Sequence, residues 1–255
     1  MKPRPALVVV KSPEEIARMR RAGQLAARAL QVVLRAVAPD VPTGHLDRLA
    51  ETFIRDHGGV PSFKNYRGYP ASICVSIDDE VVHGIPGRRR LRQGSIVSID
   101  LGVYLGGYHG DVAQTVPVGD VDEQARRLLA VTEEALAAGI REAREGRTTG
   151  DVGWAIQQVA EGAGFSVVRD FAGHGIGRDL HEGPEVPNFG TPGSGVPLRR
   201  GLTLAIEPMV NAGGSEVVLL EDGWTVRTRD RSRSAHFEHT VAVDSHGPHV
   251  LTSLD

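Results

Sequence analysis

Four acidic residues occupy similar places in the two halves of the chain. Asp100 and Asp111 lie at and after an apolar run in the first half, and Glu207 and Glu238 take the matching places in the second. A carboxylate buried in a sheet needs a partner, because its charge is unfavourable away from water. Four carboxylates in one place repel each other unless cations bind between them. The pattern therefore predicts a two-metal site, with the ions roughly 3.5–4 Å apart.

Three histidines accompany these carboxylates. His174 lies in the segment GHGIG, where the flanking glycines allow the backbone to approach another strand closely. One imidazole among carboxylates favours manganese, iron, cobalt or zinc over magnesium or calcium. His83 and His181 lie beside Gly and Pro in turn-like segments, where a side chain can act as an acid, a base or a substrate-orienting group. Each residue alone also suits an ordinary turn, cap or solvated position, so the repeated arrangement carries the prediction.

The elements that must position these side chains are predicted in two copies. Periodicity and capping signals predict helices over 12–37, 43–59, 122–143 and 149–160, and β-branched alternation predicts strands over 71–79 and 95–104. The segments 91–100 and 198–207 match, since in each a basic turn with glycine leads into an apolar strand that ends in a carboxylate. Short matches arise by chance, but a carboxylate at the same place in both copies favours a repeat. We therefore expect one pseudo-two-fold domain whose copies share one sheet and one core.

Composition limits the class of protein further. The chain has 255 residues, of which 40% are hydrophobic and 24% charged, and its formal net charge is −3. These values are typical of a soluble globular protein and argue against a general nucleic-acid binder. A single cysteine, Cys74, excludes an internal disulfide. The apolar run over 6–10 is too short for a signal peptide or a membrane helix, so we expect a cytoplasmic protein with no membrane partner.

Five segments resemble the signature segments of type I methionine aminopeptidases: SICVSIDDEVVHGIPG, SIDLGVYLGGYHGDVAQT, GHGIGRDLHEGP, LAIEPM and FEHTVAV. The resemblance extends from about residue 12 to residue 243. It implies an α+β pita-bread fold, a pseudo-two-fold repeat of helices packed on a curved, mainly antiparallel sheet. We therefore expect one catalytic domain over 1–255, with a short N-terminal extension over 1–11 and repeat halves over about 12–118 and 119–245.

The resemblance implies a place for each metal ligand. Asp100 would chelate one ion, and Asp111 and Glu238 would bridge two ions. His174 and Glu207 would bind the second ion. The expected cofactors are therefore two divalent metal ions per chain, of cobalt, manganese, iron or zinc.

The resemblance also implies roles in catalysis and substrate binding. Glu207 is the expected general base, His181 would contact the substrate carbonyl and stabilise the tetrahedral intermediate, and His83 would orient the scissile amide and serve the leaving nitrogen. The methionine pocket of the family corresponds here to Tyr66, Tyr69, Cys74 and Trp224. Two positions depart from the family pattern: Leu180 stands where an aromatic residue is common, and Phe63 stands near where a small thiol residue is common.

The implied activity is removal of the initiator methionine from nascent polypeptides with a small second residue. The enzyme is expected to be a monomer without a specific nucleic-acid partner, and Arg88–Arg90 could favour a transient contact with the ribosome. One alternative is an Xaa-Pro aminopeptidase or prolidase, which shares the ligands but usually carries an extra N-terminal domain. About eleven residues precede the first predicted helix, so that domain is not expected here. Another alternative is a non-catalytic binding protein on the same fold, which would tend to lose ligands.

Overall fold

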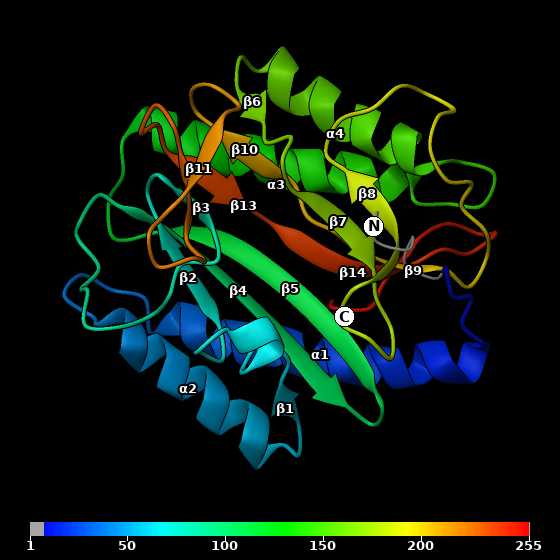
Figure 1. The fold of residues 1–255 in the computed structure, drawn as a ribbon, viewed down its shortest axis with the longest axis horizontal. Coiled ribbons are helices and arrows are strands. Elements are labelled where there is room, and N and C mark those ends of the chain that lie inside the picture. The colour runs from blue at the N-terminus through cyan, green and yellow to red at the C-terminus, as the bar shows by residue number, and fades with distance from the viewer. Residues whose placement is uncertain (1–7, 255) are drawn as a thin grey trace.

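Helices in two pairs surround a central sheet in this computed structural model, which describes residues 8–254 (Figure 1). The α-helices are α1 (Pro13–Arg35), α2 (Thr43–Asp56), α3 (Glu123–Glu142) and α4 (Thr149–Gly162), and a 3-10 helix spans Tyr66–Gly68. The strands are β1 (Val60–Pro61), β2 (Cys74–Ile77), β3 (Glu80–Val82), β4 (Ile96–Leu105), β5 (Tyr108–Pro117), β6 (Ser166–Val167), β7 (Ala172–Gly175), β8 (Glu182–Pro187), β9 (Thr203–Ile206), β10 (Met209–Asn211), β11 (Val217–Leu219), β12 (Val226–Thr228), β13 (Ser234–His236), β14 (Glu238–Ala242) and β15 (His249–Val250). Within residues 8–254, no helix is both long and apolar enough to cross a membrane.

The helices begin where their capping residues place them. The Ser12 hydroxyl accepts a hydrogen bond from the Glu15 N–H, and the Glu15 carboxylate accepts one from the Ser12 N–H, which forms the predicted capping box of α1. Thr148 and Asp151 form the same reciprocal pair at the start of α4. The four predicted helices are confirmed, and they differ from the structure only at their ends.

Strands from both halves of the chain form one nine-stranded sheet. Its order is β1-β4-β5-β14-β9-β7-β8, with β2 added beside β4 and β15 beside β14. The β4–β5 hairpin of the first half meets the second half where β5 pairs antiparallel with β14. The prediction of helices packed on a mainly antiparallel sheet is confirmed.

The apolar core has parts that belong mainly to one half and parts that the two halves share. One cluster joins α1 and α2 to β2 and β4, and another joins α3 and α4 to β9 and β14. A groove between α1 and α3 is lined in part by Gln31, Gln114, Glu133 and His239. Two smaller clusters contain residues of both halves, such as Tyr108 with Ile176 and Val82 with Met209. The two halves therefore share part of the apolar core as well as the sheet.

Asp100 lies in the middle of a strand, which agrees with the strand predicted over 95–104 and not with the matched segments 91–100 and 198–207, whose apolar runs end at the carboxylate. Strand β4 continues past Asp100 to Leu105, and β5 returns antiparallel, with Asp100 opposite Ala113. Gly106 and Gly107 both have positive φ angles and form the turn, so the strand ends there. Glu207, in contrast, directly follows β9 as predicted.

Candidate metal centre and active site

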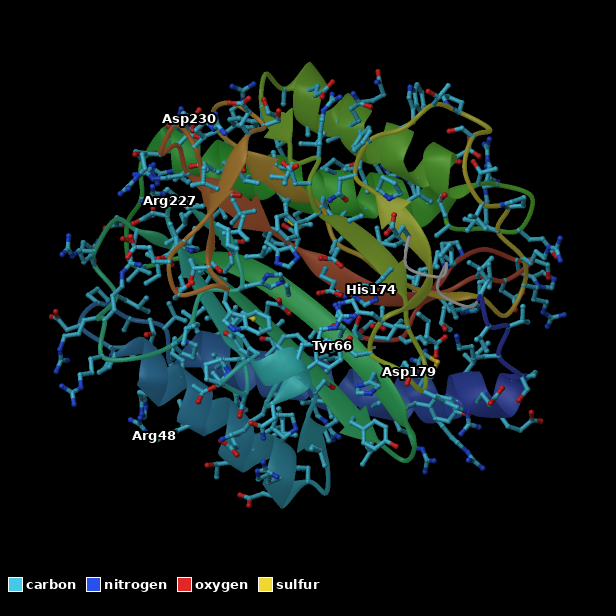
Figure 2. The ribbon with its side chains drawn as sticks, viewed as in Figure 1. Arg48, Tyr66, His174, Asp179, Arg227 and Asp230 are labelled. Atoms are coloured by element: carbon cyan, nitrogen blue, oxygen red, sulfur yellow. The ribbon has the colours of Figure 1, made fainter. Side chains whose placement is uncertain are left out.

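One cavity of about 140 Å³ is lined by all eleven candidate residues. It lies where the junction of β5 and β14 meets the loops that carry His83 and His181, and Figure 2 shows Tyr66 and His174 near the centre of the view. The candidate ligands that line it are Asp100, Asp111, His174, Glu207 and Glu238, and the other candidates are Tyr66, Tyr69, Cys74, His83, His181 and Trp224. The structure therefore brings together every residue that the sequence nominates.

Four of the candidate metal ligands lie on different strands of one sheet, and the fifth, Glu207, directly follows β9. Asp111, His174 and Glu238 offer ligand atoms that all lie within 4.8 Å of one another. Glu207 Oε1 lies 3.6 Å from His174 Nε2, and Asp100 is brought to the same cavity by the β4–β5 pairing. The site thus spans the junction between the two halves of the chain.

The buried carboxylates of this cavity fit a divalent cation. Asp100, Asp111 and Glu238 are 8%, 3% and 2% exposed. Burial, together with the charges of neighbouring carboxylates, raises the pKa of Asp100 and of Glu238 and raises the pKa of Asp111 to about 8. Asp100 Oδ1 and Glu238 Oε1 accept no hydrogen bond from the residues that the structure describes. Oxygen donors without partners, beside one imidazole, are suited to manganese, iron, cobalt or zinc.

His174 reaches the carboxylates because its strand packs unusually closely against its neighbours. A β-carbon on Gly173 would lie 2.3 Å from the Ala205 carbonyl oxygen, and one on Gly175 would lie 2.1 Å from that of Gly183. Both positions therefore require glycine, as the GHGIG segment predicts. His174 Nδ1 lies 2.8 Å from the Gly175 carbonyl oxygen, so Nε2 is the nitrogen left to face the carboxylates.

His181 lies between the rings of Tyr66 and His174. Its Nδ1 is 2.9 Å from the Tyr66 hydroxyl, and the two rings stack with centroids 5.2 Å apart. The centroids of the His174 and His181 rings are 4.1 Å apart. Burial, with the nearby His174, lowers the pKa of His181 to about 3, which leaves the imidazole neutral at neutral pH.

His83 holds a backbone conformation that is unfavourable for a residue with a side chain. Its φ angle is 62°, in the left-handed region. The ring makes edge contacts with Phe171 and Trp224, at centroid distances of 5.8 and 6.4 Å, and burial lowers its pKa. Local strain of this kind is concentrated at functional sites, which agrees with the predicted role of His83.

An apolar wall closes one side of the cavity. The Tyr69 hydroxyl donates to the carbonyl oxygens of Ile73 and Gly84, and the Tyr69 ring meets Trp224 edge-on at 5.1 Å. Cys74 is 5% exposed and lies opposite Asp100 in the pairing of β2 with β4. The two residues that depart from the family pattern, Phe63 and Leu180, also line this cavity.

Two residues of the site escaped the sequence analysis. Arg67 lines the cavity mouth with a φ angle of 49°, and its guanidinium lies 5.2 Å from the centroid of the Tyr66 ring. His236 is 1% exposed, and its Nε2 lies 3.6 Å from Glu207 Oε2. Neither ring nitrogen of His236 has a hydrogen-bond partner among residues 8–254. The sequence offered one indication that His236 belongs to the site: it lies two residues before Glu238, and alternate residues of an extended segment share a face.

Comparison with known proteins gives a consistent result. The sequence profile of metallopeptidase family M24 matches residues 17–245. The chain is 50% identical over 248 residues to methionine aminopeptidase of Clostridium perfringens, an alignment that covers 97% of this chain and 100% of the relative. The crystal structure of methionine aminopeptidase from Rickettsia prowazekii matches with a TM-score of 0.95 at 44% identity, over 97% of this chain and 100% of that one. Prolidase from Pyrococcus furiosus matches with a TM-score of 0.76 at 21% identity, over 97% of this chain and 66% of the prolidase, which shows a common fold alone. The predicted pita-bread fold is thereby confirmed.

Proposed function

The chain belongs to metallopeptidase family M24 and, within it, to the methionine aminopeptidases, and from this we propose that it removes the initiator methionine from polypeptides with a small second residue. The observation that carries the proposal is the meeting of all five candidate ligands and both loop histidines in one cavity beside an apolar wall. An Xaa-Pro peptidase would share the ligands. The prolidase likeness is far weaker than the 50% identity to a methionine aminopeptidase, which favours the methionine-specific reaction.

We propose that two divalent ions, of cobalt, manganese, iron or zinc, complete the site. Asp100 would chelate one ion, His174 and Glu207 would hold the other, and Asp111 and Glu238 would bridge them. Such ions supply a water of lowered pKa and polarise the scissile carbonyl when they are bound. The carboxylate oxygens without hydrogen-bond partners support this assignment.

The protein side chains would then move protons and hold the substrate. Glu207 accepts the proton of the attacking water as the general base. The Tyr66 hydroxyl lies 2.9 Å from Nδ1 of His181. In the tautomer whose Nδ1 accepts from this hydroxyl, Nε2–H of His181 can donate to the carbonyl oxygen as negative charge develops on it. His83 orients the scissile amide and serves its leaving nitrogen.

We propose that the methionine side chain packs against Tyr69, Cys74 and Trp224, with Tyr66 at the entrance. A flexible thioether makes favourable contacts with aromatic rings and adapts to an irregular apolar wall. The free α-amine of the substrate would bind on the Asp100 side of the site. A peptide with a blocked amine would lose this contact, so the enzyme would act only at chain ends.

We propose further that residues 1–255 act as one catalytic domain, as a monomer in the cytoplasm. The continuous sheet formed by both halves supports a single domain. Arg88–Arg90, which are exposed, would make the transient ribosome contact. A variant with all three arginines replaced by alanine should co-sediment less with ribosomes at low salt than the wild type, and equal co-sedimentation would contradict the contact.

The activity is tested by peptide cleavage after chelation, with manganese, cobalt, iron or zinc then added back separately. We expect cleavage of Met-Gly-Xaa peptides and no cleavage of Xaa-Pro or N-blocked peptides. Cleavage of Xaa-Pro without cleavage of Met-Gly-Xaa would establish the prolidase alternative. Absence of cleavage with every metal would favour the non-catalytic alternative.

A further inference from the structure

The segment ahead of α1 reaches across the fold to the loop that carries His181. The Lys11 ammonium forms an ion pair with the Glu182 carboxylate, and the two side chains are only 2% and 6% exposed. Lys11 Nζ also donates to the Val9 carbonyl oxygen at 3.0 Å. The backbone N–H of Lys11 donates to the Gly201 carbonyl oxygen at 2.8 Å. Lys11 is therefore fixed at both its backbone and its side chain.

Glu182 organises the loop over 176–181, which connects β7 to β8. Its Oε1 accepts hydrogen bonds from the backbone N–H groups of Arg178, at 2.9 Å, and Asp179, at 3.3 Å. A β-carbon on Gly177 would lie 2.4 Å from this oxygen and 2.6 Å from Lys11 Cε, so the loop closes tightly around the ion pair. One carboxylate therefore binds two loop N–H groups through one oxygen and Lys11 through the other.

The loop held in this way sets the position of His181, the residue directly before Glu182. The loop is anchored at both ends, because β7, which contains the candidate ligand His174, precedes it and β8, which begins at Glu182, follows it. Between these ends, the Glu182 carboxylate holds the backbone N–H groups of Arg178 and Asp179. On the cavity side, the Tyr66 hydroxyl lies 2.9 Å from His181 Nδ1. The His181 ring is thus held by Tyr66 at its tip and by Glu182 at its backbone.

Lys11 matters to this arrangement because Glu182 is buried. A buried carboxylate is unfavourable without an opposite charge, and removing one partner of a buried ion pair leaves that cost uncompensated. Without the Lys11 ammonium, the carboxylate would gain by turning toward water and releasing the N–H groups of Arg178 and Asp179. We propose that Lys11 is a positioning residue for the reaction, which acts through Glu182 to hold the His181 imidazole at the substrate carbonyl. The catalytic part of this inference rests on the proposed function.

The test compares four variants: Lys11→Met, Glu182→Gln, the double variant Lys11→Met/Glu182→Gln, and the conservative Lys11→Arg. We expect Lys11→Met to lower kcat on a Met-Gly-Xaa peptide by about 10-fold. KM should change little, because Lys11 does not line the cavity. Lys11→Arg should restore most of the rate. The double variant should lose less than the two single losses combined, because both act through one contact.

Arg233→Met is the matched control. Arg233 forms another long-range ion pair, at 2.7 Å from Asp122, and neither residue lines the cavity. This variant should leave kcat unchanged. Thermal unfolding of every variant shows whether a lower rate comes from loss of the fold. If Lys11→Met does not fold, Glu182→Gln tests the same contact, because it keeps the side-chain shape and an acceptor oxygen.

A second measurement does not depend on peptidase activity. In protein labelled with ¹⁵N-histidine, the ring signals of His181 should shift in Lys11→Met, whereas those of the exposed His57 and His246 should stay unchanged. If the wild type cleaved no methionine peptide, the proposed function would fail while this shift could still be observed. Unchanged His181 signals and unchanged kcat, with only a lower melting temperature, would show that the ion pair is merely structural. Equal losses in Lys11→Met and Arg233→Met would also overturn the inference.

Discussion

The Thr240 hydroxyl accepts a hydrogen bond from the backbone N–H of Asp111 and donates one to the carbonyl oxygen of the same residue, each at 2.9 Å. Thr115 makes the same two bonds to His236, each at 2.8 Å. Between these places, β5 and β14 pair at Glu238 opposite Ala113 and at the next position. On each side of the junction, a threonine hydroxyl therefore replaces the direct hydrogen bonds between the two backbones. The two strands are held further apart there, beside the carboxylates of Asp111 and Glu238.

The bond pair at Thr240 should contribute measurably to stability. Thr240→Val keeps the shape but leaves the buried N–H and carbonyl groups of Asp111 without this partner, so the free energy of unfolding should fall by about 1–3 kcal/mol. Urea unfolding in chelator measures the change. Thr240→Ser keeps the hydroxyl and should lose less, whereas equal values for the two variants would contradict the assigned role.

The mutual repulsion of the carboxylates predicts a gain of stability from the loss of a ligand. At pH 9, above the pKa of about 8 of Asp111, Asp111→Asn removes one buried charge, so the metal-free variant should melt at a higher temperature than the metal-free wild type. Added manganese or cobalt should raise the melting temperature of the wild type by mass action and should have much less effect on the variant. Thermal melting with chelator and with metal measures both effects. Asp56→Asn, at the exposed end of α2, should change neither.

Glu207 should affect the chemical step more than substrate binding. Glu207→Gln keeps an acceptor oxygen but removes the base, so kcat on a Met-Gly-Xaa peptide should fall by about 10²-fold or more. Glu216→Gln is the control for this test, because Glu216 does not line the cavity, and it should keep the wild-type rate. Turnover of Glu207→Gln at the wild-type rate would remove Glu207 from its role as general base.

Trp224 should contribute to the preference for methionine. Trp224→Ala removes the ring that meets Tyr69 edge-on and enlarges the cavity, so kcat/KM for Met-Gly-Xaa should fall about 10-fold. Discrimination against a bulkier first residue such as phenylalanine should shrink at the same time. Trp154 provides the comparison, because it is 42% exposed on α4 and Trp154→Ala should change neither value.

The stability of the chain below pH 5 should depend in part on Glu15. Hydrogen bonds from the Tyr108 hydroxyl, at 2.6 Å, and from the backbone of Ser12, together with Arg178, lower the pKa of Glu15 from 4.5 to about 2. A carboxylate whose pKa is lower in the folded state stabilises that state above its unfolded pKa, and the contribution is lost as the pH falls. The difference in melting temperature between wild type and Glu15→Gln should therefore shrink from pH 4.5 toward pH 2. Parallel curves would contradict this assignment.

Local signals in the sequence predicted the helices, because caps such as Ser12 and Glu15 act within one turn. The meeting of the four candidate carboxylates in one cavity could be predicted because the two halves repeat them. The strand predicted over 95–104 agrees with β4 to within one residue at each end, because β-branched alternation is a local signal. The matched repeat segments alone would end this strand at Asp100, and it is the pairing with β5 that accompanies it to Leu105. The ion pair of Lys11 with Glu182 joins residues 171 apart, and no local pattern distinguishes such a lysine from a solvated one.

Cys74 and Asp100 stand opposite each other on β2 and β4, so a wall of the cavity and a candidate metal ligand share one rung of the sheet. A one-residue slip of either strand would turn its side chain to the other face. An insertion or deletion in β2 would therefore disturb the substrate pocket and the metal centre together. A changed preference for the first residue of the substrate should therefore arise by substitutions in these strands and not by insertions or deletions.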